Sequence, residues 1–258
     1  MQTNLHTNKI PEIPLFTFGV IADIQYADRD SALCSYGVRR QYRNTLPLTE
    51  AAFDEWCGQR ELPSSPFKPS FVMQLGDLID GWNATDVVPT EMRWHAAEKF
   101  KHIMERLPTF HLWGNHDLYN FKRGQLLSHP LLGSSVQTFG SVASSDSLQN
   151  EKNENARRDF ELQGIIRSTG DDNKFLVKPE SPNVFPAYYS FTIGNGKSKR
   201  PNYRPWRFIV LDTYELSVIG YEKHETSYMK AKKILDANNR NQDQNSSACN
   251  FALWFSTI

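Results

Sequence analysis

The chain has 258 residues, of which 39% are hydrophobic and 22% are charged, values typical of a globular protein long enough to bury a substantial core. Lys plus Arg and Asp plus Glu number 29 each, so the chain lacks the global positive charge that collects nucleic acid or anionic membranes nonspecifically. We therefore expect no nucleic-acid or membrane partner, and any anionic small molecule must be held by a local site.

Cysteine usage and the chain ends favour a cytoplasmic protein. The three cysteines, Cys34, Cys57 and Cys249, are odd in number and widely spaced, which fits neither a disulfide framework nor a Cys-x-x-Cys metal site. The N-terminus lacks a signal-peptide pattern, and the apolar run at residues 251–255 is far shorter than the roughly 20 residues of a membrane span. We expect one main domain in a cytoplasmic monomer.

The first expected elements follow a polar leader at residues 1–14. A nearly continuous apolar run from Leu15 to Ala22 predicts a central strand covered on both faces, and this strand ends at Asp23. Apolar residues at helical spacing between Leu48 and Trp56 predict a helix. A second strand, Phe71–Leu75, then runs into Gly76-Asp77.

The next elements repeat this order. Apolar residues from Met92 to Leu107 predict an amphipathic helix that begins at Thr90 and is stopped by Pro108. A third strand, Thr109–Trp113, runs into Gly114-Asn115-His116-Asp117. Alternating strands and helices indicate an α/β layered domain with parallel neighbours, in which binding groups gather at the carboxyl ends of the strands.

The second half is less regular. Ser141–Asn173 is polar with little periodicity, which predicts a surface insertion. Residues 188–193 and 206–211 flank a Gly/Lys/Asn-rich turn and predict a β-hairpin in a second sheet. We expect the domain to span residues 15–233, followed by a divergent, disordered tail at 234–258.

Three polar clusters each follow a predicted strand. They are Asp23-Ile24-Gln25, Gly76-Asp77-Leu78-Ile79-Asp80 and Gly114-Asn115-His116-Asp117. Hard divalent cations prefer carboxylate and carbonyl oxygens, and a carboxylate between two ions can bridge them. A strand-ending Asp taken alone is more often a turn or cap residue than a ligand. The ordered set of three outweighs that reading and predicts a metal site.

These clusters resemble the signature of the calcineurin-like metallophosphoesterase superfamily, with Gln25 at a position where His is usual. Together with the segment at residues 211–220, Leu-Asp-Thr-Tyr-Glu-Leu-Ser-Val-Ile-Gly, they resemble the manganese-dependent ADP-ribose/CDP-alcohol diphosphatase family. The resemblance runs from about Phe16 to about Lys233. It implies a layered α/β metallophosphoesterase fold, a β-sandwich flanked by helices, with the C-terminal part missing from this chain.

The resemblance also implies a site with two divalent ions, Mn²⁺ being favoured over Mg²⁺ or Zn²⁺. By that resemblance Asp23 and Gln25 hold the first ion, Asp77 bridges, and Asn115 holds the second. His116 faces the substrate as a catalytic residue, and Asp117 fixes its orientation. A Gln carbonyl is a harder ligand than imidazole, which agrees with a preference for manganese or magnesium.

The implied activity is hydrolysis of the pyrophosphate bond in a nucleotide-type substrate such as ADP-ribose. The superfamily completes its site with a later His and a Gly-His-x-His segment, and none of the seven histidines here stands in such a pattern. We read His224 as part of a solvated helical face. The activity of this chain is therefore expected to be impaired, and two alternatives remain: a catalytically inactive form that acts by binding, and a generic phosphomonoesterase or phosphodiesterase.

Two further groups are candidates for substrate binding. Arg40 and Arg43 lie in a basic segment that is either a solvated turn or a phosphate clamp, since Arg binds phosphate bidentately. Tyr119 is either a core residue or a contact for the nucleobase.

Overall fold

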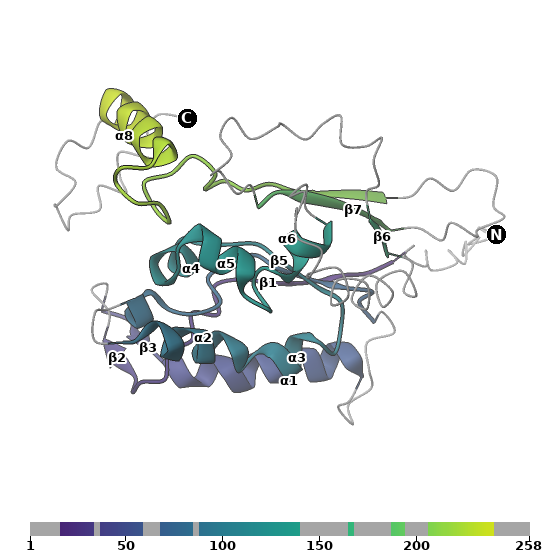
Figure 1. Cartoon of the computed structure of the whole chain (residues 1–258). Coiled ribbons are helices and arrows are strands. Elements are labelled where there is room, and N and C mark those ends of the chain that lie inside the picture. The colour runs from purple at the N-terminus through teal and green to yellow at the C-terminus, as the bar shows by residue number, and fades with distance from the viewer. Residues whose placement is uncertain are drawn as a thin grey trace, which may run out of the picture.

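The computed structural model describes residues 16–33, 37–58, 68–84, 88–139, 165–167, 187–193 and 206–239. Its centre is a parallel sheet of β1 (Gly19–Ile21), β4 (Val72–Gln74) and β5 (Thr109–His111), in the order β1-β4-β5. Helices α1 (Thr45–Cys57), α2 (Thr90–Glu98) and α3 (Lys101–Met104) lie on one side of this sheet. A second, antiparallel sheet of β6 (Ile165–Arg167), β7 (Tyr189–Ile193) and β8 (Trp206–Val210) lies on the other side (Figure 1).

The remaining elements surround these layers. A short ribbon of β2 (Ala32–Leu33) and β3 (Arg39–Arg40) precedes α1, and short 3-10 turns form at Tyr42–Asn44 and Gly81–Ala84. After β5 come α4 (Asn115–Asn120), α5 (Arg123–Ser128) and α6 (Ser134–Phe139), and α8 (Thr226–Asn238) follows β8. Within the described ranges, none of the helices combines the length and apolar composition that a membrane crossing requires.

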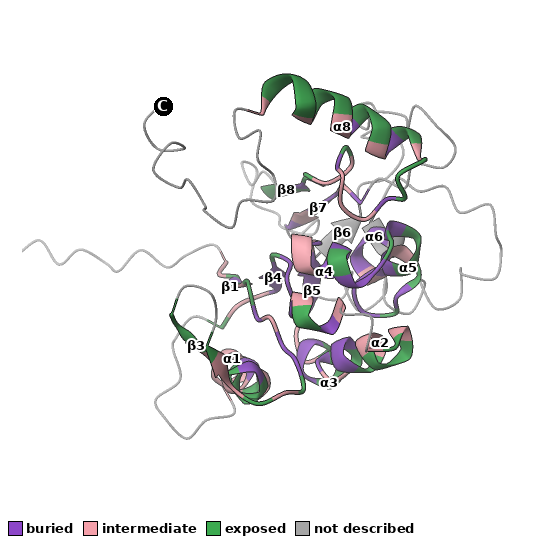
Figure 2. Cartoon of the chain, turned by 90° about the vertical axis from the view of Figure 1, so that its left-hand side faces the viewer, coloured by how far each residue is buried: buried purple, intermediate pink, exposed green. Residues whose placement is uncertain are grey.

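Aromatic side chains form the core between the two sheets. The rings of Phe110 and Phe191 stack with centroids 3.7 Å apart, and Phe71 contacts Phe191 and Phe208 edge to face at 5.5 Å and 5.1 Å. Phe71, Phe110 and Phe191 are fully buried, and each contributes about 1.5–3 kcal/mol by leaving water. Buried residues accordingly line the space between the sheets (Figure 2).

The parallel register brings the polar clusters to one edge. Gly19 pairs with Val72, and Val72 pairs with Thr109, so the three strands end side by side. The chain stays paired beyond the strands: the Gln25 N–H donates to the Asp77 carbonyl at 2.8 Å. The α/β layered sandwich flanked by helices is thus confirmed, as are the helix around residues 48–56 and the hairpin, which corresponds to β7 and β8.

The first strand was predicted at the centre of the sheet, and this is wrong for the described residues. There β4 is central and buried at all three positions, whereas β1 pairs with β4 alone and Val20 is 52% exposed. The continuous apolar run misled us because an edge strand that packs one face on a sheet can be as apolar as a central strand.

The helix predicted from Thr90 to Leu107 is two helices. The N–H groups of Phe100 and Ile103 donate to the carbonyls three residues earlier, at 3.1 Å each, so the helix tightens between α2 and α3. This break lets the Phe100 ring be fully buried against Tyr26, 5.6 Å away. Met92, assigned to the apolar face, is exposed.

The second half also differs from the prediction. Strand β6 lies inside the segment expected to be an insertion without regular structure, and it pairs with β7. Helix α8 runs across the expected domain boundary at residue 233. His224 is exposed in the turn before α8, so its helical assignment is wrong although its solvation is confirmed. The leader at 1–14, the tail from residue 240 and the rest of 141–173 lie outside the described residues.

Candidate metal centre

Three of the four expected metal ligands have an unusual backbone. Asp23, Gln25 and Asp77 have φ angles of 53°, 47° and 56°. Non-glycine residues with positive φ are uncommon, cost free energy, and cluster at functional sites. Among the described non-glycine residues, only these three have positive φ, and all three belong to the predicted site. The backbone therefore adopts an unfavourable positive φ at three of the positions where metal ligands were predicted.

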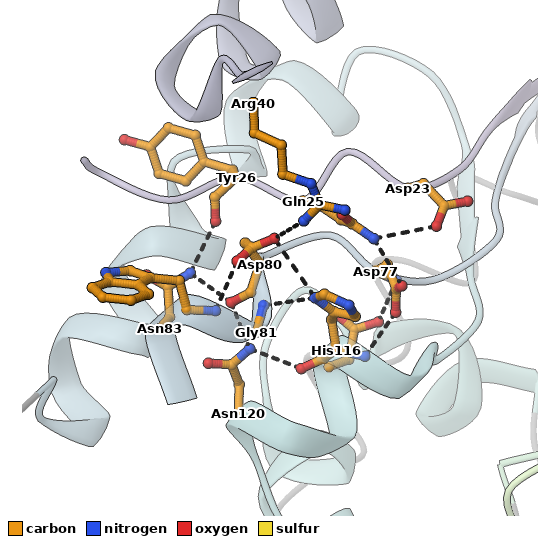
Figure 3. A network of polar contacts seen from close by, with 12 residues as sticks. Asp23, Gln25, Tyr26, Arg40, Asp77, Asp80, Gly81, Asn83, His116 and Asn120 are labelled. Carbon is orange, nitrogen blue, oxygen red and sulfur yellow. Dashed lines mark hydrogen bonds and ion pairs between the residues drawn. The ribbon is translucent and has the colours of Figure 1, made fainter. Parts of the chain in front are cut away.

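The side chains of these residues converge. Nε2 of Gln25 lies 3.4 Å from Oδ1 of Asp23 and 3.2 Å from Oδ2 of Asp77 (Figure 3). The positive end of the Gln25 amide dipole thus sits between two carboxylates, at a point where a cation would be attracted. Rotation of the amide by half a turn presents its oxygen to the same point. The arrangement fits a divalent ion held by Asp23, Gln25 and Asp77.

The donor set is made of oxygens. No group of three or more His, Cys, Asp or Glu side chains with metal-binding geometry occurs in the described part of the chain. The carboxylates of Asp23 and Asp77 and the amide of Gln25 meet at this point, and Asn115 begins α4 directly after the Gly114 turn. Such hard donors suit Mn²⁺ or Mg²⁺ better than Zn²⁺, which favours imidazole and thiolate.

Two glycines permit the close approach of the turns after β4 and β5. A Cβ atom on Gly114 would lie 2.1 Å from Oδ1 of Asp77, and one on Gly76 would lie 2.4 Å from the Gly114 nitrogen. Oδ1 of Asp77 instead accepts the His116 N–H at 2.8 Å. The absence of side chains at these glycines therefore lets Asp77 reach the start of α4.

Asp117 has a different role from the one expected. Its carboxylate accepts the backbone N–H groups of Asp77, Leu78 and Gly114 at 2.8, 3.1 and 2.9 Å. Burial raises its pKa to about 7, the Gly114 N–H lowers it, and the negative charge of Asp77 raises it again. Asp117 thus fixes the two turns that carry Asp77 and Asn115, and the expectation that it orients the His116 ring is corrected.

The His116 ring is held by the turn after Asp77. The Gly81 N–H donates to its Nδ1 at 2.6 Å, and Oδ2 of Asp80 lies 3.7 Å from the same atom (Figure 3). Because Nδ1 accepts a hydrogen bond, the ring proton resides on Nε2. Asp80, which is almost fully buried, is bound in turn by Arg40 at 2.7 Å. His116 therefore presents an N–H donor on the side away from Gly81.

Sequence reasoning missed several residues of this network. Nδ2 of Asn120 donates to the carbonyls of His116 and Asp80 at 2.8 and 3.1 Å, tying α4 to the turn of Asp80. Burial raises the pKa of Tyr214, which follows β8, and the negative charge of Asp77 raises it further. The only signal for Tyr214 was its place in the segment 211–220, and Asn120 gave none, because α4 is largely polar.

The three candidate substrate contacts separate in the structure. Arg40 lines an open cavity of about 360 Å³ together with Asp23 and Gln25. Tyr119 is 50% exposed, so the prediction that it is a core residue is wrong. Its ring lies 5.8 Å from that of His116, beside the site, so a contact with the nucleobase stays a prediction. Arg43 pairs instead with Asp28 and Asp30 at 2.7 and 2.5 Å on the surface, outside that cavity.

Comparison with known proteins agrees with this geometry. Residues 16–202 match the family model described as calcineurin-like phosphoesterase. The chain is 34% identical over 242 residues to the manganese-dependent ADP-ribose/CDP-alcohol diphosphatase of Xenopus laevis, covering 93% of this chain and 54% of that protein. The human protein of the same name is 30% identical over 237 residues, or 90% of this chain and 53% of that protein.

A solved structure is also similar. A dimetal phosphatase from Danio rerio superposes with a TM-score of 0.52 at 30% sequence identity, covering 89% of this chain and 54% of that chain. The chain thus spans about half the length of the relatives it matches.

Proposed function

The chain belongs to the calcineurin-like phosphoesterase family, and on that basis we propose that it is a two-metal hydrolase of the pyrophosphate bond in nucleoside diphosphate conjugates. The substrate class comes from relatives named as ADP-ribose/CDP-alcohol diphosphatases, and the metal, Mn²⁺, from the same names. The observation that carries the proposal is the convergence of Asp23, Gln25 and Asp77, each at positive φ, on one point.

Asp23 and Gln25 would hold one ion, Asn115 the second, and Asp77 both. When bound, the ions would supply an activated water and offset the negative charge that develops on phosphorus. Two ions in oxygen coordination take about six ligands each, more than four side chains supply. We therefore propose that the four side chains named here retain the ions weakly, with water or substrate oxygens completing the coordination.

The protein side chains have separate tasks in this proposal. The Nε2–H of His116 donates to an oxygen of the phosphate that departs, and the Gly81 N–H keeps the ring in the tautomer that makes this possible. Arg40 is bound to Asp80 through Nη1, and the residue also lines the cavity that includes Asp23. It can hold a phosphate oxygen of the substrate there.

The test compares three substrates at saturating Mn²⁺: ADP-ribose, CDP-choline and an aryl phosphate. Faster hydrolysis of either nucleoside diphosphate conjugate than of the aryl phosphate, abolished by Asp77→Asn, supports the proposal. Faster hydrolysis of the aryl phosphate would favour a generic phosphoesterase. The small number of metal donors among the described residues favours a second candidate, nucleotide binding without turnover, which predicts Mn²⁺-dependent ADP-ribose binding with no product. The cytoplasmic location and the monomeric state stay predictions.

A further inference from the structure

A polar side chain lies inside the parallel sheet, next to the turns of the metal centre. Gln74 is the last residue of the central strand β4 and is fully buried. Burying an amide costs free energy unless its polar groups are hydrogen-bonded. The Gln74 amide has a partner at both ends: Nε2 donates to the Gly76 carbonyl at 2.9 Å, and Oε1 lies 3.3 Å from Nδ1 of His111 in β5. The amide therefore links the neighbouring strand to the turn that carries Asp77.

The Gly76 carbonyl belongs to the peptide unit that precedes Asp77, and both ends of this unit are bound. Its oxygen accepts the Gln74 amide and also the Asp23 N–H, at 2.9 and 3.3 Å. Its N–H, which is that of Asp77, donates to Oδ2 of Asp117 at 2.8 Å. Rotation of this planar unit would change the φ angle of Asp77, so the three hydrogen bonds together hold that angle at 56°.

The peptide unit that follows Asp77 is bound in the same way. Its carbonyl accepts the Gln25 N–H at 2.8 Å, and its N–H, which is that of Leu78, donates to Oδ1 of Asp117 at 3.1 Å. A non-glycine residue persists at positive φ only where its surroundings over-determine the backbone. Among the partners of these two peptide units, only the Asp117 carboxylate and the Gln74 amide are side chains.

His111 sets the direction of the Gln74 amide. Because Nε2 donates to a carbonyl, Oε1 faces the His111 ring and can only accept a hydrogen bond there. Burial lowers the pKa of His111 to about 3, so the ring is neutral and the proton that it donates to Gln74 is on Nδ1. The backbone of His111 is bound in turn by Ser135 of α6 and Tyr189 of β7, at 2.9 Å each. The reverse orientation of the amide would place Oε1 against the Gly76 oxygen, where two acceptors repel each other.

We infer that Gln74 is a positioning residue of the metal centre, whose amide holds the peptide unit before Asp77 in the orientation that aims the Asp77 carboxylate at the metal ions, and that His111 keeps this amide in place. Both residues would act through the backbone of the Gly76-Asp77 turn. The inference rests on the metal site of the proposed function, because Asp77 is the bridging ligand there, and it does not depend on which bond the site cleaves.

The test compares Gln74→Met with Thr109→Val in the whole chain. Met keeps the length of the side chain but has no N–H to donate to the Gly76 carbonyl. Thr109 is the matched control because it is also buried and begins the neighbouring strand β5, at the end of the sheet away from the polar clusters. Its hydroxyl donates to the carbonyls of Met104 and Leu107 at 2.9 and 3.0 Å. Calorimetry measures the Kd of Mn²⁺, and urea unfolding measures stability.

We expect Gln74→Met to raise the Kd of Mn²⁺ roughly 10-fold to 100-fold, the loss typical when a partner that orients a metal ligand is removed. Thr109→Val should lower the free energy of unfolding and leave the Kd of Mn²⁺ unchanged. An unchanged Kd in Gln74→Met, or an equal rise in Thr109→Val, would overturn the inference, since the Gln74 amide would then serve stability alone.

The role of His111 is tested by two variants of similar size. Asn can place a side-chain N–H where the imidazole carries its Nδ1–H, whereas Leu has no donor. We expect the Kd of Mn²⁺ to be at least about 10-fold higher in His111→Leu than in His111→Asn. Equal affinities in the two variants would overturn the role of His111. The same comparison decides the inference if Gln74→Met does not fold.

Hydrolysis of ADP-ribose by the wild type is measured alongside, which separates this inference from the proposed function. A wild-type chain that binds Mn²⁺ without hydrolysing ADP-ribose would overturn the proposed hydrolase, while the Mn²⁺ affinities of the variants still decide the role of Gln74. A wild-type chain that binds no Mn²⁺ would overturn both.

Discussion

The side-chain nitrogen of Gln25 lies 3.2 Å from Oδ2 of Asp77, although the two residues are 52 positions apart in the chain. Parallel pairing of β1 and β4 produces this contact, because the residues that follow both strands leave the sheet at the same edge. An amide stands here between two carboxylates, and we expect its chemistry to set which metal the site prefers.

The first prediction concerns that amide. Gln25→His replaces a hard oxygen donor by imidazole, which should raise affinity for Zn²⁺ relative to Mn²⁺ by about 10-fold or more. Calorimetric titration of both metals measures this ratio. Gln125→His, on the exposed face of α5, is the control and should leave the ratio unchanged. An unaltered ratio in Gln25→His would mean that residue 25 is not a ligand.

The second prediction concerns the turns. Gly114→Ala forces a methyl group to within 2.1 Å of the Asp77 carboxylate, which should cost about 1–3 kcal/mol of unfolding free energy and weaken metal binding. Gly124→Ala, in α5 with nothing within 4 Å, should instead stabilise by about 0.5–1 kcal/mol. Urea unfolding of the two variants gives both values, and equal effects of the same sign would contradict the packing described here.

The third prediction concerns acid stability. Burial lowers the pKa of His129 to about 4, and its Nδ1 accepts the N–H groups of Leu131 and Leu132 at 3.2 Å each. Since the pKa is depressed in the folded state, the stability contribution is complete above the unfolded value of about 6.5 and is lost as pH falls toward 4. The loss should approach about 1.4 kcal/mol per pH unit below 6.5.

Urea unfolding at pH 7.5, 6.5 and 5.5 tests this for the wild type, His129→Gln and the exposed-site control His95→Asn. The slope with pH should flatten only in His129→Gln. Asp117, whose raised pKa acts in the opposite direction, contributes equally to all three proteins and cancels in the comparison. Parallel slopes in all three would show that His129 does not resist protonation.

The fourth prediction separates the two arginines. Arg40→Ala should raise the KM for ADP-ribose roughly 10-fold to 100-fold, because a charge-assisted contact to phosphate is lost. Arg43→Ala should leave KM unchanged, since Arg43 pairs with Asp28 and Asp30 on the surface, outside the cavity that Arg40 lines. Steady-state kinetics at saturating Mn²⁺ measures both, and a larger effect at Arg43 would place the phosphate on the other side of the ribbon β2-β3.

The position of the site could be predicted from the sequence because each polar cluster directly follows a predicted strand. Gly76-Asp77 and Gly114-Asn115 each follow an apolar run, and parallel strands bring their carboxyl ends together, so convergence followed from the order of elements. The role of Asp117 was predicted wrongly because its carboxylate accepts hydrogen bonds from backbone N–H groups, which every residue except proline carries. Tyr214 was missed because its backbone is held by a buried ion pair of Arg123 and Asp212, whose members are 89 residues apart.

The sequence predicted the layers of the fold but not the order of the strands within each sheet. The apolar run of β1 predicted that a strand forms there. It did not predict the position of that strand beside β4, because the order of strands depends on how all of them pair and pack. Strand β6 was hidden because three residues, Ile165–Arg167, are too short to show a period of two. The break before α3 came from the burial of Phe100, a tertiary demand that overrides helix continuity.

The most direct test of the two-metal account is Mn²⁺ titration followed by electron paramagnetic resonance, in the wild type and in Asp77→Asn. The account predicts two Mn²⁺ ions per chain, spin-coupled through Asp77, with weak affinity and a loss of the coupled signal in Asp77→Asn. Binding of fewer than two ions at saturation, or a coupled signal that survives Asp77→Asn, would contradict it.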